Sequence, residues 1–235
     1  SIYDSITIWT KKNGGAAKAR NCALEHIKSK YLMFLDADIV EGGYYTFTGS
    51  DKKYHAPMCD AGIYNSAYGV FSGFTCMKVL KSDLFASVVF PEGYWFEDSI
   101  MAMIIFPQVK RAVRINDVVY GYRMNQSGST AQVKKSVKSV DSYWIVEQLL
   151  KDLATMNIPV TNEIYQQLLH QGQLCYLRNQ NQPKDIQEAL FILFSDLLKR
   201  NYTRIEANDS WLLKLEQSLL TCNYTQYRLV CTLME

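Results

Sequence analysis

The chain has 235 residues, of which 48% are hydrophobic and 20% are charged, and its formal net charge is +2. These proportions are ordinary for a globular protein with a sizeable core, and the small net charge gives no reason to expect nucleic acid as a partner. No apolar run reaches the roughly 18 residues of a membrane span, and no signal-peptide pattern follows Ser1. The six cysteines form no close Cys-x-x-Cys pair, which argues against a zinc site or disulfide framework and favours a reducing, cytoplasmic compartment.

The first predicted unit is a strand, a turn and a helix. Residues 6–9 alternate as a strand does, residues 11–15 (KKNGG) are a strong turn signal, and residues 16–27 have a helical pattern. Small residues recur on one face of this helix, which favours close packing on a sheet. They are Ala16, Ala19 and Ala23.

Four positions of this unit are candidates for ligand binding. Gly14 and Gly15 would leave backbone N–H groups open to an anion at the helix start, although a tight turn is the simpler interpretation of the two glycines alone. Arg20 and Asn21 lie one turn further on, where a ligand-facing position and a solvated face explain them equally well.

Residues 31–38 (YLMFLDAD) predict a buried strand with acids at its end. Residues two apart on a strand point the same way, so Asp36 and Asp38 could converge on one Mg²⁺ or Mn²⁺ ion, which prefer oxygen ligands. A polar turn at a strand end is the other interpretation, and the spacing alone slightly favours it.

The next segments continue an α/β pattern, in which ligands bind at the carboxyl ends of strands. Glu97 and Asp98 would open a helix, where the helix dipole already favours acids. The predicted segments are a strand at 39–47, a polar loop at 51–60, a small aromatic segment at 68–74, a helix at 79–85, a turn at 91–95, an apolar helix at 100–106, a last strand at 118–122 and a polar exit at 123–132.

From about Lys134 the apolar residues repeat at helical spacing, which predicts a small helical bundle. Pro159 ends its first helix and Pro183 begins its third, and apolar stripes mark helices within 137–156, 164–176, 186–197 and 212–219. We therefore predict two domains, 1–132 and 133–235. The lysines at 134, 135 and 138 fit a solvated helix start, and contact with anionic lipid is the less favoured alternative.

Taken in order, these segments resemble the bacterial family-2 glycosyltransferases of the GT-A fold, over roughly residues 1–132. No single motif is specific, and the resemblance depends on the ordered set. The helical tail looks like those of bacterial capsule and cell-envelope members. The matching residues are Asn13-Gly14-Gly15, Ala19-Arg20-Asn21, residues 34–38, Gly73, Phe96-Glu97-Asp98, Tyr122-Arg123 and residues 127–130.

The resemblance implies a GT-A-like (Rossmann-like) mixed sheet with flanking helices, followed by an all-α region. It also implies an inverting hexosyltransferase of polysaccharide biosynthesis, with a UDP-sugar donor, a glycan or lipid-linked acceptor, and Mn²⁺ or Mg²⁺. Asp98 would be the catalytic base, and Asp36 and Asp38 would hold the metal-bound diphosphate. Substrate-binding positions would be Arg20, Gly14, Gly15, Asn21, Gly73, Glu97, Trp95 and Arg123. Trp95 fits a sugar-stacking platform or the core equally well.

Two features depart from the family pattern. The family's opening nucleotide-binding strand and acidic turn have no counterpart here, and a strand follows Asp38 directly where the family has a helix, so Asp36 is the firmer metal ligand. Two other classes stay open: a glycosidase with two carboxylates, and a non-catalytic GT-A-like scaffold that binds a partner. Contact with the inner face of the membrane and homo-oligomerisation are left open as well.

Overall fold

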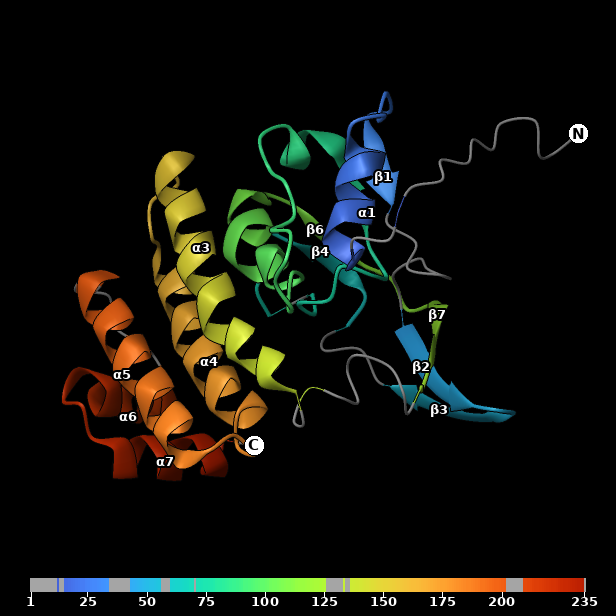
Figure 1. Ribbon diagram of the computed structural model, residues 1–235. Helices are drawn as coiled ribbons and strands as arrows, with labels where there is room; N and C mark the ends of the chain where they lie inside the picture. The colour runs from blue at the N-terminus through green and yellow to red at the C-terminus, as the bar shows by residue number, and fades with distance from the viewer. Residues whose placement is uncertain are drawn as a thin grey trace, which may run out of the picture.

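The computed structural model describes residues 12, 15–33, 43–55, 60–69, 71–125, 133, 136–201 and 209–234. Figure 1 shows an α/β part, with helix α1 and short strands, beside a helical region that contains α3 to α7. Among the described residues no helix has the length and apolar character to cross a bilayer.

Helix α1 (Gly15–Leu24) confirms the predicted helix, but its buried face is not the predicted one. Ala16, Ala19 and Ala23 are exposed, whereas Ala17 and Arg20 are buried. The helix is turned so that Arg20 reaches an acid far along the chain, and this long-range ion pair outweighs the packing preference of the small residues.

Strand β1 (Tyr31–Met33) confirms the described part of the predicted strand at 31–38 and pairs antiparallel with β5 (Val79–Lys81). The predicted helix at 79–85 is therefore wrong over its first three residues, and only the single turn η1 (Ser82–Phe85) is helical. The exposed–buried–exposed alternation of β5 is that of a strand, and three residues are too few for the local pattern to reveal it.

The sheet β3–β2–β7 is mixed, with β2 (Gly43–Thr48) parallel to β7 (Val118–Arg123) and antiparallel to β3 (Asp51–His55). Strands β2 and β7 confirm the predicted strands at 39–47 and 118–122 where these are described. The predicted loop at 51–60 is wrong over its first half. Gly49 adopts φ +59 in the turn, which lets the chain reverse within two residues and bring the tilted rings of Tyr45 and Tyr54 together, with ring centroids 5.4 Å apart.

A third small sheet pairs β4 (Gly62–Tyr64) antiparallel with β6 (Ala112–Arg114). The predicted apolar helix at 100–106 is present, wound as the π-helical turn η2 (Met101–Ile105) followed by the 3₁₀ turn η3 (Phe106–Gln108). Every residue of η2 is buried.

The helical region confirms the four predicted helices and adds a fifth that the pattern did not reveal. It comprises η5 (Val137–Val140), α3 (Asp141–Thr155), α4 (Asn162–Arg178), α5 (Lys184–Asn201), α6 (Ser210–Leu220) and α7 (Tyr224–Leu233). Helix α7 was missed because only Tyr227, Val230 and Cys231 are buried on it, too short an apolar stripe to stand out.

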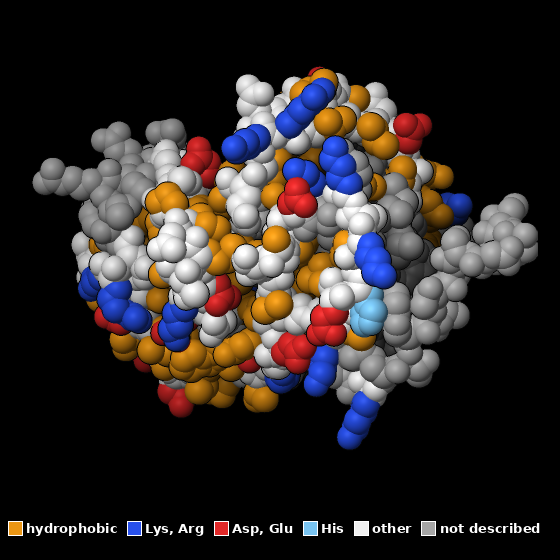
Figure 2. Space-filling view, turned by 90° about the horizontal axis from the view of Figure 1, so that it is seen from above, with side chains coloured by type: hydrophobic (Ala, Val, Ile, Leu, Met, Phe, Trp, Pro, Cys, Tyr) orange, Lys and Arg blue, Asp and Glu red, His pale blue; other side chains and the backbone are white. Residues whose placement is uncertain are grey.

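One hydrophobic core joins the two parts, because η2 packs against α3 and α4. Within the helical region, Gly172 of α4 lets Phe194 of α5 approach so closely that an added Cβ would come within 3.1 Å of the ring. Seen from above, acidic and basic side chains are interspersed on the surface, with hydrophobic side chains gathered over the helical region (Figure 2). The division at residue 132 stays a prediction, and the core is continuous across it.

Candidate active site

The loop formed by residues 90–98 is held at both ends by two successive residues of α1. The Asn21 amide donates to the Phe90 carbonyl at 3.0 Å and accepts from the Phe90 N–H at 2.8 Å. The Arg20 guanidinium forms an ion pair with Glu97 at 2.7 Å, with 8% of the arginine side chain and 20% of the glutamate side chain exposed. Helix α1 therefore fixes where the acids at the end of this loop lie.

The helical region holds the same loop from the other side. The backbone N–H of Trp95 donates to the Asp141 carboxylate at the start of α3, at 2.9 Å. The guanidinium carbon of Arg178, the last residue of α4, lies 3.8 Å from the centroid of the Phe96 ring. The 90–98 loop thus lies between the two parts of the molecule and contacts both.

Lys138 adds a third contact from the helical region. Its ammonium group donates to the Gly93 carbonyl at 2.9 Å and lies 3.4 Å from Asp141. About half of its side chain is exposed, which agrees with a solvated helix start that also anchors the loop. The other two lysines of this predicted cluster lie outside the described residues.

The backbone of the loop is strained immediately before the two acids. Phe96 adopts φ +66, a left-handed conformation that bulky residues rarely take. Asn157 and Cys222 also have positive φ, but each follows a helix end, where backbone hydrogen bonds support that conformation. Phe96 has no such helix end before it, so its conformation, which costs about 1–3 kcal/mol, must be held by tertiary contacts.

Asp98 lies in a cluster of four charged side chains. Burial of the half-buried carboxyl and the negative charge of Glu97 together raise the pKa of Asp98 to about 6, although Arg178 and Arg20 act in the opposite direction. Asp98 is therefore mostly ionised at neutral pH and more basic than an ordinary carboxylate, which suits a general base.

Arg178 was not among the residues singled out from the sequence. Burial lowers the pKa of its guanidinium, and the Asp98 charge raises it again. Its Nη1 atom is buried and has no hydrogen-bond partner among the residues that the structure describes. A basic residue in the last turn of a helix is what the helix dipole favours anyway, so the sequence offered no signal of a role in the site.

The other predicted site residues are distributed more widely. Trp95 is half-buried and makes an edge contact with Phe96, with ring centroids 6.3 Å apart. Gly15 begins α1 with φ +86, a conformation that favours glycine. Gly73 is exposed, and Arg123 is exposed at the end of β7. Within the described ranges, no hydrogen bond or ion pair connects either of them with the acids of the loop.

Gly14 and the predicted metal ligands Asp36 and Asp38 lie outside the described residues. Among the residues that are described, no three His, Cys, Asp or Glu side chains are grouped so as to hold a metal ion. A metal site at Asp36 and Asp38 therefore stays a prediction.

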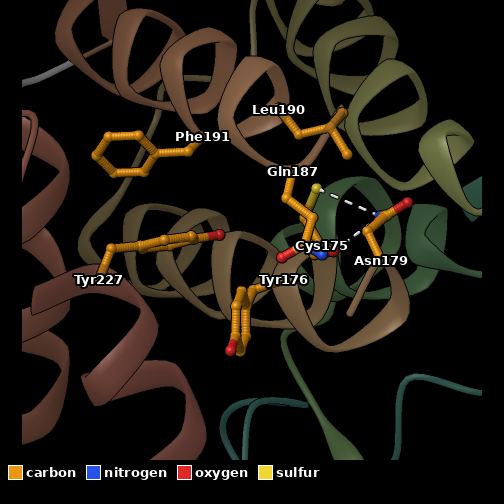
Figure 3. Close-up of a pocket in the computed structure, with 7 residues that line it drawn as sticks. All are labelled: Cys175, Tyr176, Asn179, Gln187, Leu190, Phe191 and Tyr227. Carbon is orange, nitrogen blue, oxygen red and sulfur yellow. Dashed lines mark hydrogen bonds between the residues drawn. The ribbon is translucent and has the colours of Figure 1, made fainter. Parts of the chain in front are cut away.

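Two hollows elsewhere in the described structure are separate from the candidate site. One, of about 10 Å³, has room for about one water and lies among the helices, where Phe191 and Tyr227 face each other and Asn179 bonds to Cys175 (Figure 3). The other, of about 320 Å³, opens at the carboxyl end of α1 between Ile27 and Phe85. Neither is lined by the acids of the loop, and the first is far too small for a nucleotide sugar.

Comparison with known proteins finds glycosyltransferases. Residues 3–40, which include α1, match the model of the family described as Glycosyl transferase family 2. The chain is also similar to Glycosyltransferase GlyA of Streptococcus pneumoniae serotype 4, at 23% identity over 68% of this chain and 28% of GlyA. The chain thus spans little more than a quarter of the length of that curated relative.

Proposed function

We propose that this chain carries the transferase site of an inverting family-2 glycosyltransferase. It would move a sugar from a nucleotide-diphosphate donor, with UDP the favoured nucleotide, to a hydroxyl group of a glycan or lipid-linked acceptor. The similarity to glycosyltransferases supports the class of reaction. The geometry around Asp98 supports the assignment of the base.

The observation that carries the proposal is the ion pair between Arg20 and Glu97. Arg20 lies in the segment that matches the family model, and Glu97 lies 77 residues further along the chain, beside the candidate base. Two parts of the predicted motif set are therefore in contact in the folded protein, and the contact leaves Asp98 in the same charged cluster.

Asp98 is proposed to accept the proton of the acceptor hydroxyl while that oxygen attacks the anomeric carbon. The new glycosidic bond forms as the bond from the anomeric carbon to the phosphate oxygen breaks, and the nucleoside diphosphate leaves on the opposite side with inversion. General-base assistance of this kind contributes about 10²–10⁴-fold in rate. Because the pKa of Asp98 is about 6, the reaction should lose rate as the pH falls below that value.

A divalent cation held by Asp36, with Asp38 as the less firm second ligand, is part of the proposal. Such an ion supplies charge neutralisation to a departing diphosphate. The remaining predicted donor contacts, from Gly14, Gly15, Gly73 and Arg123, stay proposals. Arg20 and Asn21 are engaged in holding the loop, so we propose that they support the site through the loop in addition to any contact with the nucleotide.

The test is an assay of a panel of nucleotide sugars with wild-type protein, Asp98→Asn and Asp196→Asn. Asp98→Asn should lower transfer at least about 10²-fold with retained UDP binding. Asp196 is an exposed acid of α5 paired with Arg200, so Asp196→Asn is the matched control and should transfer at the wild-type rate. Wild-type transfer by Asp98→Asn would contradict the assignment of Asp98 as the base, whereas the absence of transfer by the wild-type protein with every donor would favour the scaffold alternative.

Thermal stability measured with and without UDP and Mn²⁺ distinguishes the proposed transferase from the glycosidase alternative. A transferase should melt at a higher temperature when both are added, since ligands that bind the native state stabilise it. A glycosidase has no use for a nucleotide and should not respond. Glu97 is already paired with Arg20, which leaves Asp98 without a second free carboxylate beside it in the described structure and weakens the glycosidase alternative.

A further inference from the structure

Arg178 joins the helical region to the candidate base. It lies at the end of α4, its guanidinium stacks on Phe96, and its charge acts on Asp98. Phe96 is also the strained residue that sets the direction of the chain entering Glu97 and Asp98. One side chain therefore contacts the turn that presents the base and also acts on the base through its charge.

We propose that Arg178 is the positioning residue for Asp98. Through Arg178 the helical region would also contribute to the part of the site that binds the acceptor. The inference rests on the proposed function, because it assigns Asp98 as the base. It goes further in assigning a role to a residue outside the part of the chain that matches the family model, and in stating which substrate that residue faces.

The position of Arg178 is fixed by the end of its helix. Asn179, the next residue, is 2% exposed and its amide donates to the Ser139 carbonyl, the Ser142 hydroxyl and the Cys175 carbonyl at 2.8–3.1 Å. The Ser139 hydroxyl donates back to the side-chain oxygen Oδ1 of Asn179 at 2.8 Å. This buried network ties the end of α4 to the start of α3. Arg178, which precedes Asn179, is therefore held at a fixed position.

The planar guanidinium suits this position better than an ammonium group would. A guanidinium can lie flat on an aromatic ring and still offer N–H donors in its own plane, whereas lysine provides a single hydrated point charge. The 3.8 Å approach to the Phe96 ring uses the flat face, and the buried Nη1 keeps an N–H for an oxygen that the described residues do not supply.

The stereochemistry of the reaction indicates which substrate that oxygen belongs to. A hydroxyl whose proton Asp98 takes must lie within hydrogen-bond reach of the carboxylate, and so within the charged cluster to which Arg178 contributes. In an inverting transfer the leaving diphosphate departs from the opposite face of the sugar. Arg178 therefore serves the acceptor hydroxyl, not the nucleotide.

The charges that face Asp98 determine the direction in which its pKa should move when Arg178 is changed. Glu97 raises the pKa of Asp98, while Arg178 and Arg20 lower it. Removing the Arg178 charge should raise that pKa, by about one unit for a close partner, and should move the acid limb of the kcat/KM profile to higher pH by the same amount.

The experiment compares Arg178→Met, Arg178→Lys and Arg228→Met in the full chain. Arg228→Met is the matched control, because Arg228 also stacks on an aromatic ring, that of Tyr224, but on α7. Arg178→Met should move the acid limb upward by about one pH unit and raise KM for the acceptor at least about tenfold, with KM for the donor unchanged. Arg178→Lys should keep the wild-type acid limb but lower kcat, and Arg228→Met should change neither.

Direct titration of Asp98 by carboxyl NMR gives a readout that does not need activity. The titration should shift upward in Arg178→Met and stay in place in Arg178→Lys and Arg228→Met.

If the wild type transfers no sugar but the titration shifts, the proposed function fails while the pairing of Arg178 with Asp98 stands. If the wild type is active and Arg178→Met lowers the rate equally at all pH values with no shift, Arg178 is merely structural and the inference is overturned. A higher KM for the donor alone would overturn the assignment to the acceptor side.

Discussion

The two parts of the molecule are stabilised in different ways. The helical region is built from helices of 10 to 18 residues whose apolar stripes meet in a buried core, and its buried polar network around Asn179 is internally satisfied. The α/β part has strands of only three to six residues, and its irregular loops are positioned by side-chain contacts between distant segments.

This difference shows where the chemistry can be located. The three charges around Asp98 come from α1, from the 90–98 loop and from α4, so the candidate site is formed where the two parts meet. A region that is regular and well packed can hold a strained, charged loop in place, as Phe96 requires. The helical region is in this respect a support for the site.

The largest effect is expected in the core of the helical region. Phe194→Ala should lower the free energy of unfolding by about 3–5 kcal/mol, because the fully buried ring fills the space beside Gly172 and leaves a cavity when it is removed. Because the core is continuous with η2, chemical denaturation should still show a single transition. Ile192→Ala, at a 61% exposed position of the same helix, should change stability by less than about 0.5 kcal/mol. Two separate transitions would show that the two parts fold independently.

Breaking the ion pair between α1 and the loop should have the next largest effect. Arg20→Met leaves the mostly buried Glu97 without its partner and should cost about 2–3 kcal/mol, somewhat less than a fully buried pair. The double variant Arg20→Met/Glu97→Gln should recover at least about 1 kcal/mol of that loss. Arg200→Met, which breaks an exposed pair on α5, should cost no more than about 1 kcal/mol. Strict additivity of the two single changes would mean that the pair does not hold the loop.

The buried network should respond more modestly. Asn179→Ala leaves the buried groups of Ser139 and Ser142 without their partner and should cost about 1–3 kcal/mol by denaturant unfolding. The exposed Gln217→Ala on α6 is the control and should be neutral within about 0.5 kcal/mol. If the loss in Asn179→Ala also lowers transfer, the end of α4 is coupled to the site, as the placement of Arg178 requires.

The smallest predicted effect on stability is an increase, and it is expected for Asp98→Asn. Because the pKa of Asp98 is raised to about 6, the folded protein binds its proton more tightly than the unfolded chain, and stability falls as the pH rises from about 4 to about 6. Above that range the ionised carboxylate costs folding free energy, so Asp98→Asn should stabilise the protein at pH 7.5 by about 1–2 kcal/mol. Unfolding at pH 4 is the internal control, since the gain should largely vanish there. A destabilised Asp98→Asn at pH 7.5 would mean that the carboxylate is structural.

A companion test uses the neighbouring acid. Glu97→Gln removes the like charge that raises the pKa of Asp98, so the acid limb of the pH–rate profile should move to lower pH. Glu92→Gln, at an exposed residue of the same loop, should leave the limb in place. An unmoved limb in Glu97→Gln would show that Asp98 is not the group that titrates.

Much of the fold could be predicted because its signals are local. The helical spacing gave α3 to α6 and α1, and strands were also predicted at the positions of β2 and β7. The failures have two causes: β3 and β5 are strands because of their pairing partners, and α7 has too few buried residues to form a stripe. The role of Arg178 could not be predicted from the sequence, because the helix dipole already favours a basic residue at the end of a helix.

The sequence by itself determined the helices and the types of residue available for chemistry, because side chains three and four positions apart on a helix lie on one face whatever surrounds them. It also supplied the adjacent acids Glu97 and Asp98. Only the tertiary structure decided that Arg20 of α1 pairs with Glu97, that Arg178 of α4 lies over Phe96 and acts on Asp98 through its charge, and that Phe96 is held in a strained turn. The physical reason is that burial and neighbouring charge set how basic a carboxylate is, and apart from the adjacent Glu97 the charges that act on Asp98 belong to Arg20 and Arg178, which are distant in the sequence.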